Sequence, residues 1–197
     1  CHTHETGMRV LLIAAVATVA DAFSSVVPEE VCRPLRDCSL MPDGWVTQFT
    51  VSKRQYESTK TADEVWAHIR DHEVFAQGVG MKVITDGFLD KNSVGTIRSY
   101  TDSLGLGIRQ IIYSMVEESH FGFRTFAICG PNAEAFSPLL GFCSAELSMN
   151  QTATGWELSL SATLASNNEV LLSEQIVPPF EVGSDTLLSL QDDWFSA

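Results

Sequence analysis

Two groups of titratable side chains have a spacing that could support chemistry. His68 and His72 are four residues apart in the segment HIRDH, so a continuous helix would place both imidazoles on one side, where they could bind a metal ion. The segment lacks the central glutamate of the HExxH zinc-protease motif, and we therefore expect no metal site. Glu117, Glu118 and His120 are candidates for general acid–base catalysis, but they lie between two strand-like runs, where a polar hairpin turn is common.

Motifs for phosphate, dinucleotide or acyl-transfer chemistry are absent from the sequence. The GLG at residues 105–107 lacks the third glycine and the following helix of a dinucleotide-binding loop, and there is no GxSxG, phosphate-binding loop or CxxC. The catalytic residues are therefore unknown from sequence, and we expect no cofactor. Whether the protein is an enzyme stays uncertain, with noncatalytic binding favoured.

The composition argues against one large class of partner. The chain has 197 residues, a hydrophobic fraction of 45% and a formal net charge of −13, which allows a real core and leaves no cluster of basic residues. Because phosphate backbones select for lysine and arginine clusters, we expect no nucleic-acid partner. We also expect no stable membrane insertion, since an acidic surface disfavours anionic membranes and no second apolar span follows the first.

The N-terminal residues have the pattern of a targeting segment. Residues 8–23 start with Met-Arg, continue through an apolar run too short to span a bilayer comfortably, and reach Ala-Asp-Ala, the small-x-small pattern of a signal-peptidase site. We interpret residues 1–22 as upstream residues and a signal peptide, which predicts the secretory pathway or the extracellular space. Phe23, directly after that site, leaves open a bipartite plastid signal, and a buried N-terminal helix is a further alternative.

The sequence does not determine whether the cysteines form disulfides or remain free thiols. Cys32, Cys38, Cys129 and Cys143 follow the proposed cleavage site, and four cysteines allow three pairings. Export makes disulfides plausible: Cys32–Cys38 would close a small loop, and Cys129–Cys143 would tie the ends of a Gly/Pro-rich connection. Free thiols packed in a core are the alternative.

Most of the remaining chain reads as strands. Residues 23–44 carry several prolines and little periodicity, so we interpret them as a linker or loosely packed arm before a domain at 45–197. Apolar and polar residues alternate in the later segments, which indicates a sheet with one covered and one wet face. Short spacings predict hairpins between sequence neighbours and hence antiparallel pairing. The predicted strands are 46–58, 81–89, 94–102, 108–117, 121–129, 143–151 and 155–165.

Helices are predicted at two places. TADEVWAHIRD at residues 61–71 begins with Thr61 three residues before Glu64, a capping-box spacing, and carries an apolar stripe that includes Trp66 and Ile69. A short turn, HEVFAQ, follows it. After Pro178-Pro179, the pattern of residues 182–197 predicts a C-terminal helix of about three turns.

This order of elements, together with four sequence segments, resembles the START-related helix-grip superfamily. That superfamily includes START lipid-transfer domains, polyketide cyclase/dehydrase-like proteins and pollen-allergen-like ligand binders. The segments are TADEVWAHIRD after the first strand, GTIRSY at 95–100, GFRTFAI at 122–128 and TGWELSLSATL at 154–164. The resemblance implies an α+β fold in which a seven-stranded curved antiparallel sheet grips a C-terminal helix, with two short helices after strand 1.

The resemblance also implies an apolar cavity between the sheet and the helix. Trp66 and Ile69 would border that cavity or pack in the core, and the polar groups that orient a ligand would come from the strands, although each of these could instead face solvent. The favoured function is binding or transport of a hydrophobic small molecule, such as a lipid, polyketide or pigment-like compound. The alternatives are a polyketide cyclase/dehydrase-like enzyme and a structural domain with a filled interior. The polar candidates are Arg98, Tyr100, Tyr113 and Arg124.

Overall fold

The computed structural model describes residues 32–75, 82–86, 92–101, 107–130, 133 and 139–197. The proposed signal peptide and residues 23–31 of the predicted arm lie outside the described residues. No helix among the described residues is long and apolar enough to cross a membrane.

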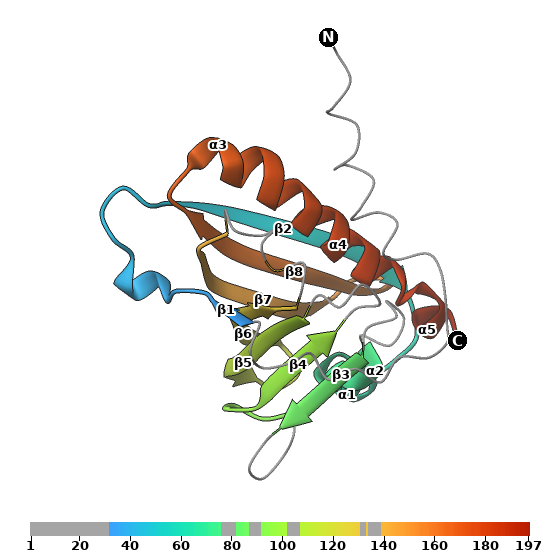
Figure 1. Ribbon diagram of the computed structural model, residues 1–197. Coiled ribbons are helices and arrows are strands. Elements are labelled where there is room, and N and C mark those ends of the chain that lie inside the picture. Colours follow the sequence, from blue (N-terminus) through green and yellow to red (C-terminus); the bar gives the residue numbers. More distant parts are fainter. Residues whose placement is uncertain (1–31, 76–81, 87–91, 102–106, 131–132, 134–138) are drawn as a thin grey trace.

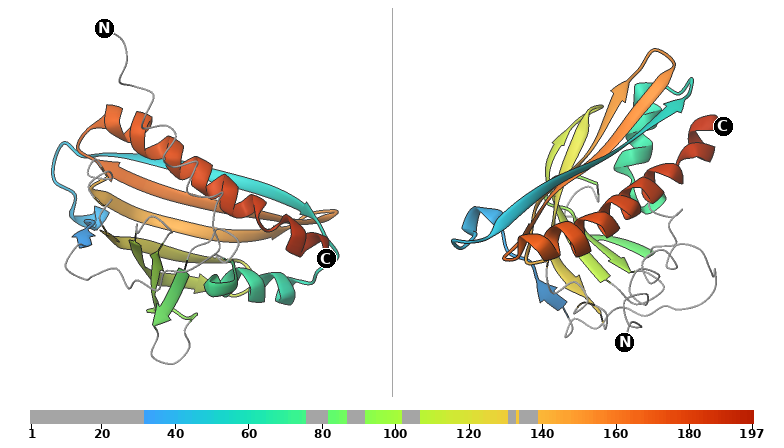
Figure 2. Two further views of the ribbon diagram at one scale, coloured as in Figure 1. Left: turned by 45° about the vertical axis from the view of Figure 1, so that its right-hand side comes forward. Right: turned by 90° about the horizontal axis from the view of Figure 1, so that it is seen from above.

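Among the described residues, seven strands follow one another in one curved antiparallel sheet, and a short eighth strand joins the sheet off this order. A C-terminal helix lies across the sheet (Figures 1 and 2). Strands that follow one another in sequence pair as hairpins from β3 to β8, and β2 pairs with β8 at the far edge. The predicted α+β class and antiparallel order are therefore confirmed. Across the sheet the order is β2 (Val46–Glu57), β8 (Gly155–Ser166), β7 (Gly141–Gln151), β6 (His120–Cys129), β5 (Gly107–Val116), β4 (Ile97–Thr101) and β3 (Lys82–Asp86).

The two faces of the sheet differ in polarity because the strand sequences alternate. In β8 every second side chain from Trp156 to Leu164 is buried, and the residues between them are half-buried and mostly polar. Leu158 and Leu164 are fully buried, and each such leucine contributes about 1.5–3 kcal/mol relative to an exposed one. The main apolar core therefore lies on the face of the sheet that the helices cover.

Two short helices, α1 (Ala62–Arg70) and α2 (His72–Phe75), close one end of the sheet (Figure 1). The predicted capping box is present: the Thr61 backbone N–H donates to Glu64 Oε2 at 2.8 Å, and the Glu64 N–H donates to Thr61 Oγ1 at 3.4 Å. The stripe of α1 that includes Trp66 and Ile69 is buried, so the helix is amphipathic as its spacing predicts.

The C-terminal helix begins earlier than the sequence pattern predicts. It comprises α3 (Glu169–Leu171), a π-helical turn (Leu172–Ile176), α4 (Val177–Ser189) and α5 (Asp192–Ser196), and Asn168 caps its start by accepting from the Leu171 N–H. Pro178-Pro179 thus lies inside the helical run rather than before it. Proline is tolerated there because both residues fall in the first turn of α4, directly after the π-helical turn has changed the hydrogen-bond pattern.

Helix α4 packs mainly against β2 and β8. The Tyr56 hydroxyl of β2 donates to the Leu188 carbonyl oxygen at 2.7 Å, and the Tyr56 ring stacks on Phe195 with centroids 4.0 Å apart. At the same end, His68 of α1 lies 2.8 Å from Gln191 Oε1 and stacks on Trp194. These contacts join the C-terminal helices to both the edge of the sheet and α1.

The described part of the predicted arm is held on the sheet rather than lying apart as a linker. Strand β1 (Cys32–Pro34) pairs with Ala127–Cys129 of β6, whereas β7 pairs with β6 only along His120–Phe123. β1 therefore takes the place that β7 leaves beside β6. The chain then bridges to Gly141 of β7 through Arg36, at the end of the sheet opposite α1 and α2 (Figures 1 and 2).

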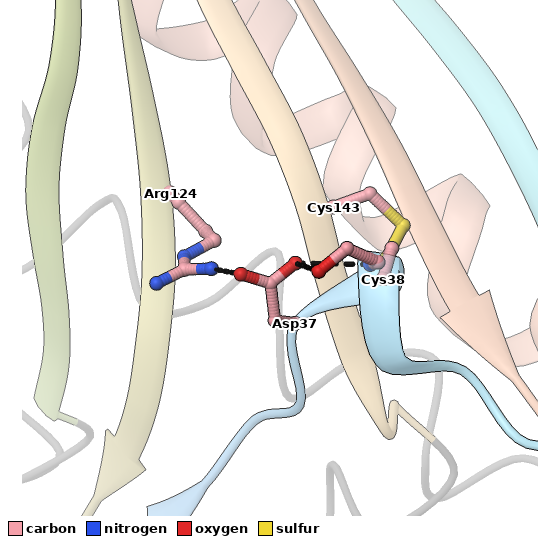
Figure 3. Close-up of a disulfide and its surroundings, with 5 residues drawn as sticks. Asp37, Cys38, Arg124 and Cys143 are labelled. Atoms are coloured by element: carbon pink, nitrogen blue, oxygen red, sulfur yellow. Dashed lines mark hydrogen bonds and ion pairs between the residues drawn. A yellow bond between two sulfur atoms is a disulfide. The ribbon is translucent and has the colours of Figure 1, made fainter.

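Both pairs of cysteines form disulfides, in a pairing that the sequence interpretation did not single out. The bonds are Cys32–Cys129 and Cys38–Cys143, and neither the Cys32–Cys38 nor the Cys129–Cys143 bond forms. The reason is register, because β1 places Cys32 directly opposite Cys129. Beside the second disulfide, the Arg124 guanidinium pairs with the Asp37 carboxylate on the outer side of β6 (Figure 3).

Candidate functional site

The covered face of β4, β5 and β6 carries polar side chains in an apolar setting. Arg98 of β4 is the cross-strand partner of Gln110 in β5, and Gln110 is in turn the partner of Thr125 in β6. Gln110 Nε2 donates to Thr125 Oγ1 at 3.2 Å. The alternation of β4 also brings Tyr100 to this face. We call Arg98, Tyr100, Gln110 and the adjacent His72 of α2 the interior polar cluster.

Arg98 dominates the electrostatics of the interior polar cluster. Its side chain is completely buried, and among the described residues none of its three guanidinium nitrogens has a hydrogen-bond partner of normal geometry. Its Cζ lies over the Phe121 ring, 4.9 Å from the centroid, a cation–π contact. Burial lowers the pKa of Arg98, and the nearby Tyr100 hydroxyl and Asp71 carboxylate oppose that shift. Arginine still stays protonated at neutral pH, so the described residues leave a buried positive charge without a salt-bridge partner.

His72 and Tyr100 stand against Arg98 with unsatisfied polar atoms of their own. Their ring centroids are 5.5 Å apart, and within the part of the chain that the structure describes neither the Tyr100 hydroxyl nor His72 Nδ1 has a hydrogen-bond partner of normal geometry. Burial and the Arg98 charge hold the pKa of His72 well below its usual range, so this imidazole is neutral at neutral pH. Burial raises the pKa of Tyr100 to about 12, so the phenol keeps its proton.

Aromatic rings frame the interior polar cluster. Phe75, Phe121 and Phe123 all lie within 6.2 Å of the His72 ring, measured between centroids. Gln110 Oε1 is also buried and has no hydrogen-bond partner in the described ranges. The site therefore offers one cation, one phenolic donor and two further polar atoms to a molecule that would otherwise contact apolar and aromatic surface.

The structure divides the six site residues suggested by the sequence. Trp66 and Ile69 are buried in the core, where Trp66 meets Phe121 edge-on with centroids 6.4 Å apart, and Arg98 and Tyr100 face the same interior.

Tyr113 and Arg124 lie outside that interior. Tyr113 is 48% exposed at an irregularity of β5 and lies over Gly122 on the outer face, and Arg124 pairs with Asp37 (Figure 3). The register of β6 with its neighbours places Arg124 on the outer face. Phe121 and Phe123 point inward, so the alternate residues Gly122 and Arg124 point outward.

Two members of the interior polar cluster were missed from sequence. From the sequence alone, His72 is considered only as a candidate metal ligand, but the α1–α2 junction turns His72 inward, where it is only 5% exposed. Gln110 lies in an apolar strand without any motif. Its cross-strand pairing with Arg98 is the signal that identifies it, and that pairing depends on the register of β4 and β5.

The titratable groups considered for catalysis do not gather in one place. His68 contacts Gln191 and His72 contacts the phenylalanines, so the two imidazoles do not share a ligand position. Glu118 lies in the exposed β5–β6 turn, where a hydrogen bond to Asp63 raises its pKa. Within the described ranges, no group of three His, Cys, Asp or Glu side chains is arranged to hold a metal ion.

A surface depression lies apart from the interior polar cluster. It has a volume of about 590 Å³ and lies between the end of β2, the start of α1 and the C-terminus, with Lys60, Glu64 and Phe195 among its lining residues. Its lining is mostly polar and open to solvent, so it lacks the enclosed apolar surface of a typical small-molecule site.

Comparison with known proteins identifies the fold through structure alone. No family model matches the chain, and no curated protein matches its sequence. Among solved structures, Ara h 8.0201 matches with a TM-score of 0.58 and 11% identity over 77% of this chain and 99% of that one. Ginseng major latex-like protein 151 from Panax ginseng matches with a TM-score of 0.56 and 14% identity over 76% and 96% of the two chains.

An enzyme has the same fold. Norcoclaurine synthase from Thalictrum flavum, solved in complex with dopamine and hydroxybenzaldehyde, matches with a TM-score of 0.53 and 14% identity over 75% of this chain and 87% of that one. The structural neighbours are thus helix-grip proteins, and the predicted fold is confirmed. Because the neighbours include an enzyme, the fold does not choose between binding and catalysis.

Proposed function

We propose that this protein binds or transports a hydrophobic small molecule held between the curved sheet and the C-terminal helix. The observation that carries the proposal is the interior polar cluster. It consists of buried polar atoms that have no hydrogen-bond partner of normal geometry among the described residues and that lie among phenylalanine rings. Unsatisfied buried polar atoms are costly and rare in proteins, and they cluster where a ligand or water supplies the missing partner.

The apolar part of the ligand would supply most of the binding free energy. Transfer of apolar surface from water contributes about 25 cal/mol per Å², so burial of 200 Å² is worth about 5 kcal/mol before the losses of entropy on binding. The polar cluster would then orient the molecule. A lipid, a polyketide or a pigment-like compound has the required combination of extended apolar surface and few polar groups.

Catalysis of the cyclase or dehydrase type is the second candidate, and one observation favours it. Neutral His72 and protonated Tyr100 are adjacent and buried, and among the described residues His72 Nδ1 and the Tyr100 hydroxyl lack a hydrogen-bond partner of normal geometry. In this role His72 accepts a proton while Tyr100 donates one to a ligand oxygen. Turnover of a bound polyketone by the wild-type protein, lost in His72→Asn and in Tyr100→Phe, would establish this role.

We further propose that the protein works in the secretory pathway or outside the cell, with a plastid as the alternative. The support comes from the sequence pattern of residues 8–23 and from the two disulfides, which form readily in oxidising compartments. Microscopy of a fluorescent fusion that keeps the native N-terminus would distinguish these compartments.

Binding can be tested by native mass spectrometry of the oxidised protein purified from its own source, followed by solvent extraction of any retained molecule. A matched pair of variants locates the site. Thr125→Trp would fill space beside Gln110, whereas Val116→Trp adds the same ring at a half-exposed position of the neighbouring strand. We expect both variants to fold and only Thr125→Trp to lose the ligand.

The same pair of variants can reject the proposal. If Thr125→Trp fails to fold while Val116→Trp folds, the interior has no room for a tryptophan, and a structural role with a filled core is favoured. Equal ligand retention by both variants would place the ligand elsewhere.

A further inference from the structure

The charge of the interior polar cluster specifies the kind of polar group that the ligand brings. Arg98 is fully buried, and its guanidinium has five N–H donors and no acceptor. Among the described residues, none of its nitrogens has a hydrogen-bond partner of normal geometry, and no carboxylate forms an ion pair with it. A neutral ligand would leave this positive charge unbalanced in a low-dielectric environment, where an uncompensated ion costs several kcal/mol.

The groups around Arg98 do not supply the missing negative charge. The Phe121 ring face attracts the guanidinium but is a weak acceptor compared with an oxygen. His72 is neutral and Tyr100 is protonated, and Gln110 offers an amide oxygen without a net charge. Asp71 acts on Arg98 only at a distance, while its carboxylate accepts from the backbone N–H groups of Glu73 and Val74.

We propose, building on the proposed function, that the ligand is an amphiphile with a carboxylate head and that Arg98 binds this carboxylate. Two carboxylate oxygens match the planar fork of a guanidinium, which binds them through two parallel hydrogen bonds. The Tyr100 hydroxyl lies beside Arg98 and donates a further hydrogen bond to the same head. The apolar tail then extends from the polar cluster toward the phenylalanine rings and the core.

A carboxylate fits better than a phosphate because of charge balance. A carboxylate carries a single negative charge, which the single Arg98 cation neutralises. A phosphate monoester carries a charge of about −1.5 to −2 at neutral pH. Among the described residues of the interior polar cluster there is no second cation to balance the remainder.

The test is competition for a neutral apolar dye, N-phenyl-1-naphthylamine, by matched probes at pH 7.5. The probes are dodecanoate, its methyl ester and dodecyl phosphate, which have saturated tails of eleven or twelve carbon atoms and differ in head group. Because a hydrogen-bonded buried charge pair is worth about 1.5–3 kcal/mol, we expect dodecanoate to compete about 10- to 100-fold more strongly than the ester. Dodecyl phosphate should compete less strongly than dodecanoate.

Variants assign the preference to Arg98. Arg98→Met should lose the preference for dodecanoate over the ester, and Arg98→Lys, which keeps the charge without the planar fork, should keep only part of it. Arg124→Met is the matched control on the outer face, where the preference should be unchanged. If Arg98→Met does not fold, Arg98→Lys alone still tests the role of the fork.

The outcomes separate this inference from the proposed function. Binding of the dye with equal competition by acid and ester overturns the carboxylate proposal and leaves hydrophobic binding intact. An acid preference that persists in both Arg98 variants also overturns it. If neither the dye nor any probe binds, hydrophobic binding fails, and the carboxylate proposal fails with it.

Discussion

Replacement of Arg98 by methionine should stabilise the ligand-free protein. Most substitutions of a fully buried residue destabilise a fold, but this side chain carries a charge in an apolar environment and has no hydrogen-bond partner of normal geometry among the residues described. Methionine has a similar length, adapts to irregular space and carries no charge. The substitution therefore removes a desolvation penalty without opening a large cavity.

The size of the effect follows from two opposing contributions. The effective penalty for a buried ion is several kcal/mol, and replacement of buried charges by apolar residues of similar volume gains about 1–4 kcal/mol where it has been measured. The cation–π contact with Phe121, at 4.9 Å from Cζ to the ring centroid, stabilises the wild type by about 1–2 kcal/mol, and the variant loses this contact. We therefore expect a net gain of about 2 kcal/mol, which is a rise in Tm of about 4–8 °C for a domain of this size.

The measurement is urea unfolding and calorimetry of the oxidised protein after removal of any bound lipid. Ligand removal is essential, because an anion that binds only the native wild type would raise its apparent stability. Arg124→Met serves as the control, since its half-exposed ion pair with Asp37 contributes only about 0–1 kcal/mol. A loss of more than about 1 kcal/mol in Arg98→Met would show that Arg98 has a stabilising partner in the native state, and the reasoning would be refuted.

Three further perturbations test the fold and its electrostatics. Because burial lowers the pKa of His72, the folded state resists its protonation, and stability should fall below about pH 6.5 by up to about 1.4 kcal/mol per pH unit. His72→Phe should reduce this fall in stability at acid pH, measured by urea unfolding at a series of pH values. An unchanged fall would contradict the burial of the imidazole. Gly155→Ala should lower the free energy of unfolding by about 2–4 kcal/mol, because Gly155 has a positive φ and a Cβ there would lie 2.2 Å from the Tyr56 carbonyl oxygen. Gly183→Ala, in open space on α4, should raise the free energy of unfolding by about 0.5–1 kcal/mol. Chemical unfolding of the two glycine variants checks the sign of each change. Removal of the second disulfide by Cys38→Ser with Cys143→Ser should cost about 3 kcal/mol, because with the other bond in place it closes a loop of about 20 residues. An unchanged unfolding midpoint under oxidising conditions would show that this bond does not form.

Local sequence signals predicted the individual elements well because their causes are local. The alternation at residues 143–151 and 155–165 corresponds to β7 and β8 within two residues at each end. The Thr61–Glu64 spacing gives the capping box that starts α1. Each of these patterns depends on side chains a few residues apart, so no tertiary information is required.

The features that sequence reasoning missed depend on contacts between distant segments. The inward face of β6 is set by its register with β5 and β7, and the sequence FGFRTFAIC is apolar or aromatic on both faces. The disulfide pairing depends on β1 lying beside β6, at a sequence separation of 97 residues for Cys32 and Cys129. The burial of His72 depends on the angle between α1 and α2, which no short motif encodes.

The C-terminal helix was predicted too short for a different reason. Two adjacent prolines ordinarily end or precede a helix, so Pro178-Pro179 predicts a helix that begins only after them. The π-helical turn at Leu172–Ile176 allows the chain to continue through them. Such turns are rare and have no reliable sequence signature, so the pattern alone could not reveal the earlier start.

The pairing of β2 with β8 has a consequence for biosynthesis. The first long strand, β2, pairs with a strand that lies about 100 residues later in the sequence. Strand β1 likewise cannot pair until β6 has been synthesised. On a ribosome or in a translocation channel, β2 therefore emerges with both backbone edges uncovered until nearly the whole chain has been made. A chain with this topology folds slowly and exposes a strand that can aggregate, so its yield should depend on chaperones that hold the nascent N-terminal half.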